Sequence, residues 1–97
     1  MRIIKKKTLQ EYWENHSDSK EPLINWYEQV RTKNWKTPQD VKNFRGDASI
    51  LPDNRVVFNI KGNDYRLVVR MNYEYGKVFI RFIGTHAEYD KIDAGSI

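Results

Sequence analysis

A change in hydrophobic period near residue 55 constrains this chain more than any other feature. Before that point, apolar side chains recur at spacings of three and four residues, which is the pattern of amphipathic helices. From Arg55 onward they alternate with polar side chains, as in strands with one buried face. A chain of 97 residues supports only one hydrophobic core, so helices and strands must share it. We therefore expect one α+β domain spanning residues 1–97.

The N-terminal half predicts three helices after a short strand-forming segment at residues 2–4. Thr8 and Glu11 have the spacing of a capping box, which predicts that the first helix begins there. Pro22 suits the first turn of a second helix. Residues 37–46 predict a brief third helix, with a threonine cap, a proline at the first helical position and a terminating glycine.

The C-terminal half predicts three strands, at residues 55–61, 65–71 and 77–83, and a short closing helix. In the last strand, alternation places Phe82 on the buried face and Ile83 on the other. Thr85 and Glu88 form a further capping box that opens the closing helix. The expected fold is α+β: a small antiparallel sheet with the N-terminal helices packed on one face and a short C-terminal helix.

The same alternation gathers basic side chains on the other face of the sheet. Residues 55–83 carry six basic and only two acidic side chains, in a chain whose net charge is +4. The six are Arg55, Lys61, Arg66, Arg70, Lys77 and Arg81. Such a surface attracts polyanions, which favours nucleic acid as the partner, although a face that is merely solvated is the alternative. On this face Phe79 is suited to stack on an RNA base or to lie beneath the C-terminal segment.

Candidates for catalysis are few. The chain has two histidines, no cysteine and no acidic cluster at ligand spacing, so we expect no metal site and no thiol chemistry. No apolar stretch is long enough for a membrane span or a signal peptide. His16 lies on the apolar stripe of the first helix and is interpreted as structural. His86 begins the closing helix and shares one helical face with Tyr89, which fits proton transfer and helix capping equally well.

Two segments, residues 55–69 and 81–90, resemble the HigB toxins of bacterial type II toxin–antitoxin pairs, which belong to the RelE-like superfamily. The resemblance is carried by the elements Phe-Asn-Ile-x-Gly-Asn and Thr-His-x-Glu-Tyr-Asp in combination. It implies a RelE-like fold, the bacterial cytoplasm and a metal-independent mRNA interferase without a cofactor. It also implies cleavage of mRNA, commonly on the translating ribosome, and neutralisation by a HigA-type antitoxin with a helix-turn-helix domain.

The resemblance also implies site residues. Arg66 matches the strand arginine that binds the scissile phosphate, and Arg81 would be a second phosphate clamp. His86 would act as general base or acid, and Tyr89 as a proton donor or a base-stacking residue. Asn59 stands where RelE has a lysine, so it can orient a phosphate or a 2′-hydroxyl but cannot accept a proton, and Lys61 is the reserve base. The expected RNA-binding residues are Arg55, Lys61, Arg70, Lys77 and Phe79.

Two other functions remain open at this point. A non-catalytic RNA-binding or antitoxin-binding module would keep the same fold and the same basic face. A DNA-binding protein is less favoured, because the sequence lacks a helix-turn-helix signal. For any of the toxin-like functions, we expect the antitoxin to carry an acidic segment or to cover the basic face.

Overall fold

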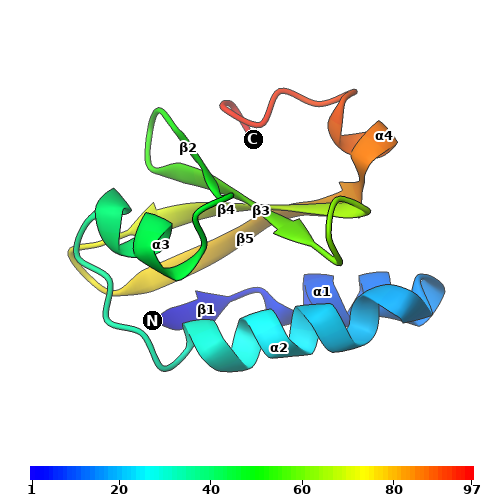
Figure 1. Cartoon of the computed structure of the whole chain (residues 1–97), viewed down its shortest axis with the longest axis horizontal. Coiled ribbons are helices and arrows are strands. Elements are labelled where there is room, and N and C mark those ends of the chain that lie inside the picture. The colour runs from blue at the N-terminus through cyan, green and yellow to red at the C-terminus, as the bar shows by residue number, and fades with distance from the viewer.

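The computed structural model describes residues 1–97 as helices packed on one five-stranded sheet (Figure 1). The elements in chain order are β1 (Arg2–Ile4), α1 (Lys6–Asn15), the 3-10 helix η1 (Ser17–Ser19), α2 (Lys20–Val30), α3 (Pro38–Phe44), β2 (Ser49–Leu51), β3 (Arg55–Ile60), β4 (Tyr65–Asn72), β5 (Lys77–Thr85) and α4 (His86–Tyr89). The predicted α+β class is confirmed. β2 was not predicted, because three residues are too few to show a period.

The sheet has the strand order β1-β5-β4-β3-β2. From β2 to β5, each strand pairs antiparallel with the next one in the chain, as expected for consecutive strands joined by short turns. β1 instead pairs parallel with β5, with Arg2 opposite Lys77. The expectation of a wholly antiparallel sheet is therefore wrong at this edge. The helices carry the chain from β1 to β2 at the far edge, and the successive antiparallel strands then bring β5 back beside β1 in the same direction.

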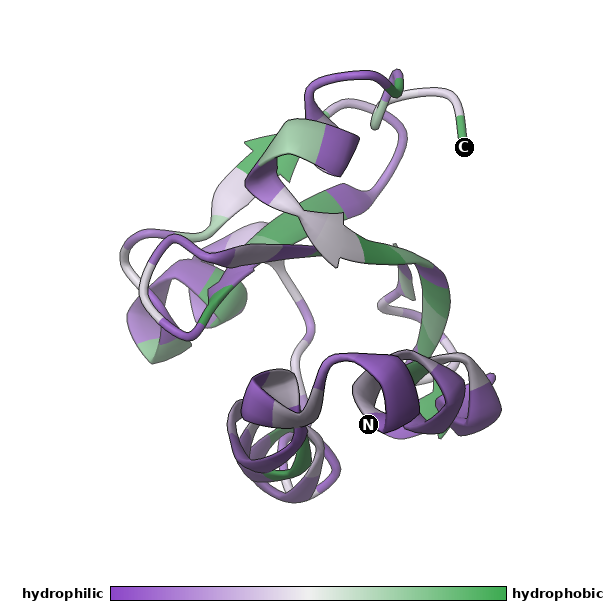
Figure 2. Cartoon of the chain, turned by 90° about the vertical axis from the view of Figure 1, so that its right-hand side faces the viewer, coloured by the Kyte–Doolittle hydropathy of each residue, from purple (hydrophilic) through white to green (hydrophobic).

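The core lies between the sheet and the N-terminal helices. α1 and α2 lie side by side against one face of the sheet, while α4 and the C-terminal residues lie on the opposite face (Figure 1). Figure 2 shows hydrophobic residues concentrated in the strands, above helices that are largely hydrophilic. Trp26 of α2 is fully buried and meets Phe58 of β3 edge to face, with ring centroids 5.4 Å apart. This contact joins the two layers at their centre.

A β-bulge at Arg81 changes which side chains β5 buries. Val68 pairs with Phe82 and Val69 pairs with Ile80, so Arg81 has no partner on β4. The extra residue reverses the alternation beyond it. Ile83 therefore joins the helix-side core, and Phe82 packs on the opposite face. The predicted orientations of Phe82 and Ile83 are both wrong, because they assumed an uninterrupted period of two.

The capping predictions have mixed outcomes. Thr8 does not cap α1, which begins at Lys6 after Lys5 in a left-handed conformation (φ 73°) without a side-chain cap. The helix thus begins within the lysine run, two residues upstream of the capping signal. Thr37 and Thr85 do form complete capping boxes, at the starts of α3 and α4. The second of these fixes the point where the chain leaves β5 for the opposite side of the sheet.

Candidate functional site

The face of the sheet opposite α1 and α2, here called the outer face, carries four rows of cross-strand neighbours, of which the last, at the β4–β5 hairpin, contains Asn72, Lys77 and Arg2. Its centre is set by Val57 and Val68, which pack in a small cluster separate from the main core. The rows follow from the strand register. The Arg66 row contains Asn59, Arg66 and Gly84; the Val68 row contains Val57, Val68 and Phe82; the Arg70 row contains Arg55, Arg70 and Phe79. Opposed side chains in such rows lie close together.

α4 places His86 at the same end of the sheet as the Arg66 row. The Thr85 hydroxyl accepts a hydrogen bond from the Glu88 amide at 3.1 Å, and the Glu88 carboxylate accepts one from the Thr85 amide at 2.8 Å. The His86 amide donates to the Asp64 carbonyl at 3.2 Å, which ties the start of α4 to the β3–β4 turn. Since that turn leads directly into Arg66, the predicted proton-transfer residue and the predicted phosphate-binding residue are held at one end of the outer face.

The polar side chains of this end have defined partners. His86 Nδ1 lies 3.3 Å from Asp90 Oδ2, and the two side chains are 55% and 58% exposed. Arg66 is half-buried as a residue, and its guanidinium donates to the Asn63 carbonyl at 2.9 Å in an exposed position. Asn59 Nδ2 donates to Asp47 Oδ2 at 3.2 Å. An accessible imidazole with a carboxylate on its Nδ1 side is suited to proton transfer, because the carboxylate orients the ring.

Tyr89 lies half-buried rather than free on the surface. Its ring packs with the C-terminal residues Ile92, Ala94 and Ile97 against the Val68 row. The two residues predicted to share a helical face therefore have different environments. His86 is open to solvent, whereas Tyr89 packs on the sheet.

Arg55 does not belong to the exposed basic surface, so its predicted role in RNA binding is wrong. The side chain is buried, and only 7% of the residue is accessible. Its Nε donates to the Ile97 carbonyl at 2.6 Å, and a terminal nitrogen meets Asp53 Oδ2 at 2.7 Å. The arginine holds the C-terminal segment on the sheet. No sequence pattern indicates this contact, since residues 90–97 have no periodicity that would predict docking on a strand.

Lys61 also leaves the outer face, which corrects its placement among the six basic residues of that face. Its Nζ lies 2.8 Å from Asp18 Oδ2 on η1 and 3.4 Å from Asp64 Oδ2. The hydrogen bond with Asp18 raises the pKa of Lys61, and the same bond lowers the pKa of Asp18. A lysine held protonated by two carboxylates is poorly suited to be the reserve base.

The bulge carries Arg81 to the edge of the sheet beside α1. There it lines a hollow of about 390 Å³ together with Tyr12 and His16, while no member of the Arg66 row lines it. The His16 ring stacks on Tyr12 at a centroid distance of 4.0 Å, which agrees with a structural role for this histidine. The structure thus separates Arg81 from the surroundings of Arg66.

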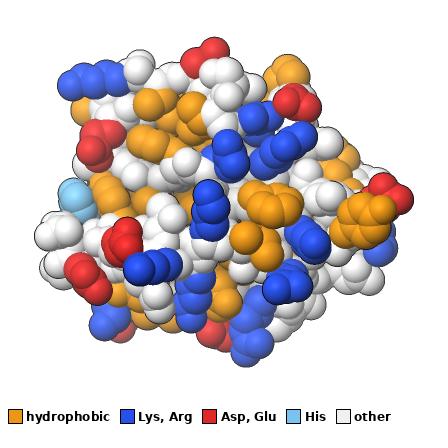
Figure 3. All heavy atoms as spheres, turned by 180° about the vertical axis from the view of Figure 1, so that it is seen from behind, with side chains coloured by type: hydrophobic (Ala, Val, Ile, Leu, Met, Phe, Trp, Pro, Cys, Tyr) orange, Lys and Arg blue, Asp and Glu red, His pale blue; other side chains and the backbone are white.

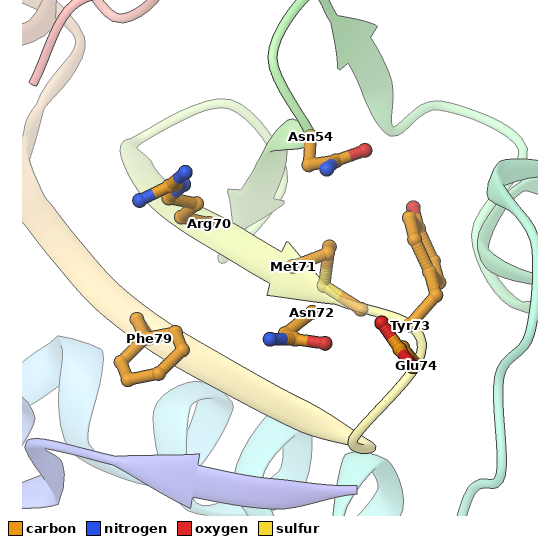
Figure 4. Close-up of a pocket in the computed structure, with 7 residues that line it drawn as sticks. All are labelled: Asn54, Arg70, Met71, Asn72, Tyr73, Glu74 and Phe79. Carbon is orange, nitrogen blue, oxygen red and sulfur yellow. The ribbon is translucent and has the colours of Figure 1, made fainter.

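The Arg70 row opens onto the largest hollow of the molecule, of about 480 Å³, at the end of the β4–β5 hairpin (Figure 4). Its lining includes Arg70, Phe79, Asn54 and Asn72. Phe79 is half-buried and lies outside the cluster beneath the C-terminal residues, so it is not covered by them as the alternative interpretation required. Sequence reasoning identified Arg70 and Phe79 by alternation but missed both asparagines. Alternation could have found Asn72, two residues after Arg70 on β4, whereas the place of Asn54 depends on tertiary contacts.

β1 adds to the basic surface. Arg2 lies opposite Lys77 in the parallel pair, and both residues are out of phase with the core residues Ile3 and Val78. Figure 3 shows Lys and Arg side chains across the middle of one side of the molecule, with hydrophobic side chains between them and most acidic side chains toward the margin. Arg2 was missed because the pairing partner of a three-residue strand cannot be read from its sequence.

No group of three or more His, Cys, Asp or Glu side chains is placed to hold a metal ion. None of the helices combines the length and the apolar character that crossing a membrane requires.

Comparison with known proteins supplies the family. Residues 19–92 match the family described as HigB_toxin, RelE-like toxic component of a toxin-antitoxin system. The chain is 30% identical to the mRNA interferase toxin HigB of Escherichia coli (strain K12), over 93% of this chain and 88% of that protein. It is 26% identical to the mRNA interferase HigB of Escherichia coli O6:H1, over 95% of this chain and 91% of the relative. The chain therefore belongs to the HigB family of RelE-like toxins of toxin–antitoxin systems.

Proposed function

We propose that this chain is an mRNA interferase, a single-domain endoribonuclease that cuts RNA at the Arg66 row without a metal ion. The observation that carries the proposal is the hydrogen bond between the His86 amide and the Asp64 carbonyl. It holds an accessible imidazole at the end of the sheet where Asn59 and Arg66 are cross-strand neighbours. The names of the relatives support the same activity, since they are called mRNA interferases.

The proposed reaction is attack of a ribose 2′-hydroxyl on the adjacent phosphate. A base removes the 2′-hydroxyl proton, the 2′-oxygen bonds to phosphorus, and the bond from phosphorus to the 5′-oxygen breaks. The leaving 5′-oxygen takes up a proton, so the products are a 2′,3′-cyclic phosphate and a 5′-hydroxyl. His86 and Tyr89 share the two proton transfers, with Asp90 orienting the imidazole.

Arg66 and Asn59 act on the phosphate. The extra negative charge of the pentavalent state develops on the non-bridging oxygens, where a fixed cation is most effective. The Arg66 guanidinium is held by the Asn63 carbonyl and stays open to a phosphate. Asn59 supplies an amide that orients the phosphate or the 2′-hydroxyl. Arg70, Lys77 and Arg81 extend the basic surface for the rest of the strand, and Phe79 offers a stacking face.

We also propose the cellular setting that the family resemblance implies. The substrate is mRNA, cut on the translating ribosome in the bacterial cytoplasm, and the inhibitor is a HigA-type antitoxin with a helix-turn-helix domain. The exposed basic residues support an antitoxin whose acidic segment covers the outer face, because charge complementarity both steers association and blocks RNA.

Expression of the chain without an antitoxin tests the enzymatic function. The wild type is expected to arrest growth and to fragment mRNA, whereas Arg66→Ala and His86→Ala abolish both effects. Removal of a general acid or base typically lowers a rate by about 10²–10⁴-fold. Arg31→Ala is the matched control, because this arginine follows the last residue of α2, in the helix layer, and pairs with Glu28. Arrest with intact mRNA would instead support the non-catalytic binding module.

A further inference from the structure

The hollow at the β4–β5 hairpin has the chemistry of a site for a nucleobase. Its volume of about 480 Å³ falls within the range of small-molecule sites. One aromatic ring, two carboxamides, one guanidinium, one phenol and one carboxylate line it, together with a thioether. The residues are Phe79, Asn54, Asn72, Arg70, Tyr73, Glu74 and Met71. Figure 4 shows that they come from β4, β5, the hairpin turn and the residues just before β3.

The asparagine on β4 is oriented and has unused donors. Asn72 Oδ1 accepts a hydrogen bond from the Tyr75 amide at 3.0 Å, which fixes the carboxamide plane. Its Nδ2 group is thereby left as a fixed donor. Asn54 is positioned by its own backbone, because its carbonyl accepts from the Met71 amide at 2.7 Å. Two carboxamides on anchored backbone can read the hydrogen-bonding edge of a base.

The charged and phenolic groups distinguish a base from a bare phosphate. Arg70 is exposed and has no carboxylate partner. Glu74 adds an acceptor that attracts the amino group of a base and repels a phosphate. Burial, with a smaller contribution from Asp40, raises the pKa of Tyr73, so its hydroxyl stays protonated. Donors and acceptors beside an aromatic face suit a heterocycle, while Arg70 and Lys77 suit the backbone outside the hollow.

The position of the hollow fits a strand bound at the Arg66 row. Arg66 and Arg70 lie on the same face of β4, four positions apart, which is about 13 Å along a strand. The C-terminal segment packs on the Val68 row between them, including Phe82 of β5, and ends at Arg55 of β3, which binds Ile97. It does not cover Phe79 or Arg70 on the side of β5. The Arg66 row and the hollow therefore lie on either side of the covered Val68 row, at a separation that a short stretch of single-stranded RNA can span.

We propose that this hollow binds one unpaired nucleobase of the RNA substrate, stacked on Phe79 and read by Asn72 and Asn54, and so sets a sequence preference at a fixed distance from the cut. The inference rests on the proposed function for its biological meaning. Its physical content, preferential binding of one base, does not require cleavage.

The test changes one donor and leaves the fold in place. Asn72→Asp keeps an oxygen that accepts from the Tyr75 amide but replaces the Nδ2 donor by an acceptor. Asn25→Asp, on the exposed side of α2, is the control with the same change of charge. Binding is measured with short single-stranded 2′-O-methyl oligonucleotides that differ in one base, since these lack the nucleophile for cleavage. In parallel, the cut sites of unmodified mRNA are mapped for each protein.

We expect the wild type and Asn25→Asp to share a preference for one base, and Asn72→Asp to change that preference roughly tenfold or more. The mapped cuts should shift at one position by a similar factor. Equal binding of all oligonucleotides, binding of none, or an unchanged preference in Asn72→Asp overturns the inference, even if mRNA is cut. A preference that Asn72→Asp changes, in a protein that cuts no mRNA, supports this site and refutes the nuclease.

Discussion

Gly84 lies close to the ring of Phe82, so its replacement by alanine directly tests how tightly that ring is packed on the outer face. A Cβ at this position would lie 2.5 Å from Phe82 Cζ and 3.2 Å from Glu88 Cβ. Ordinary contacts begin at 3.4 Å, so the Phe82 ring must withdraw by about 0.9 Å. The ring is held by the cluster formed by the Val68 row and the C-terminal residues. Overpacking of this kind costs about 1–3 kcal/mol.

The expected result is a fall in Tm of roughly 5–20 °C for Gly84→Ala, since 1 kcal/mol corresponds to several degrees in a domain of this size. Gly46→Ala is the matched control. Neither glycine has a positive φ, and a Cβ at Gly46 meets nothing within 4 Å. We expect its Tm to be unchanged or slightly raised, because alanine reduces the entropy of the unfolded chain.

A double-mutant cycle identifies the contact responsible. Phe82→Leu removes the ring atoms that collide with the new methyl group, so Gly84→Ala should cost much less in that background. Thermal unfolding followed by circular dichroism measures all four proteins. An equal loss of Tm in both backgrounds, or an equal effect of the two glycine substitutions, would refute the reasoning.

Three further predictions concern the supports of the site. Thr85→Val should destabilise the protein by about 1 kcal/mol and speed hydrogen exchange in α4, while Thr85→Ser, which keeps the hydroxyl cap, should change neither. Arg55→Met should cost about 1.5–3 kcal/mol and expose residues 92–97 to proteolysis, and unaltered cleavage of that segment would contradict its anchoring role. Asp18 is hydrogen-bonded to Lys61 and Tyr65, and these bonds depress its pKa. Its contribution to folding stability is therefore fully present above the unfolded pKa of about 3.9 and is lost as pH falls through the lower pKa of the folded state. Asp18→Asn should therefore flatten the fall of Tm with acidification, and parallel curves for the two proteins would show that this carboxylate is not involved.

The helices and the three long strands could be predicted because each repeats its hydrophobic pattern over several residues. The Thr85 box lies as predicted, and so do Asn59 of β3 and Arg66 of β4 on one face of the sheet, since local signals specify them. The errors have a common cause. The bulge at Arg81, the parallel pairing of β1 and the burial of Arg55 depend on residues distant in sequence, and no local pattern reports such contacts.

The candidate site shows the same division. Alternation placed Asn59, Arg66 and Arg70 on one face, and the structure agrees. It also placed Lys61 there, but the nearby Asp18 draws that side chain toward the helix layer. The long side chain of a basic residue near a strand end can bend to pair with a nearby carboxylate. Alternation along the strand therefore does not predict on which side of the sheet its charge lies.

The chemistry of the cut ends tests the central claim most directly. RNA from cells that express the wild type, Arg31→Ala, Arg66→Ala or His86→Ala is labelled at free 5′-hydroxyl groups with polynucleotide kinase, and the labelled ends are mapped. Side-chain catalysis at the Arg66 row predicts new 5′-hydroxyl ends within mRNA for the wild type and Arg31→Ala, and none for Arg66→Ala or His86→Ala. Cuts that carry 5′-phosphates, or 5′-hydroxyl ends that persist at full level in both catalytic variants, would contradict the account.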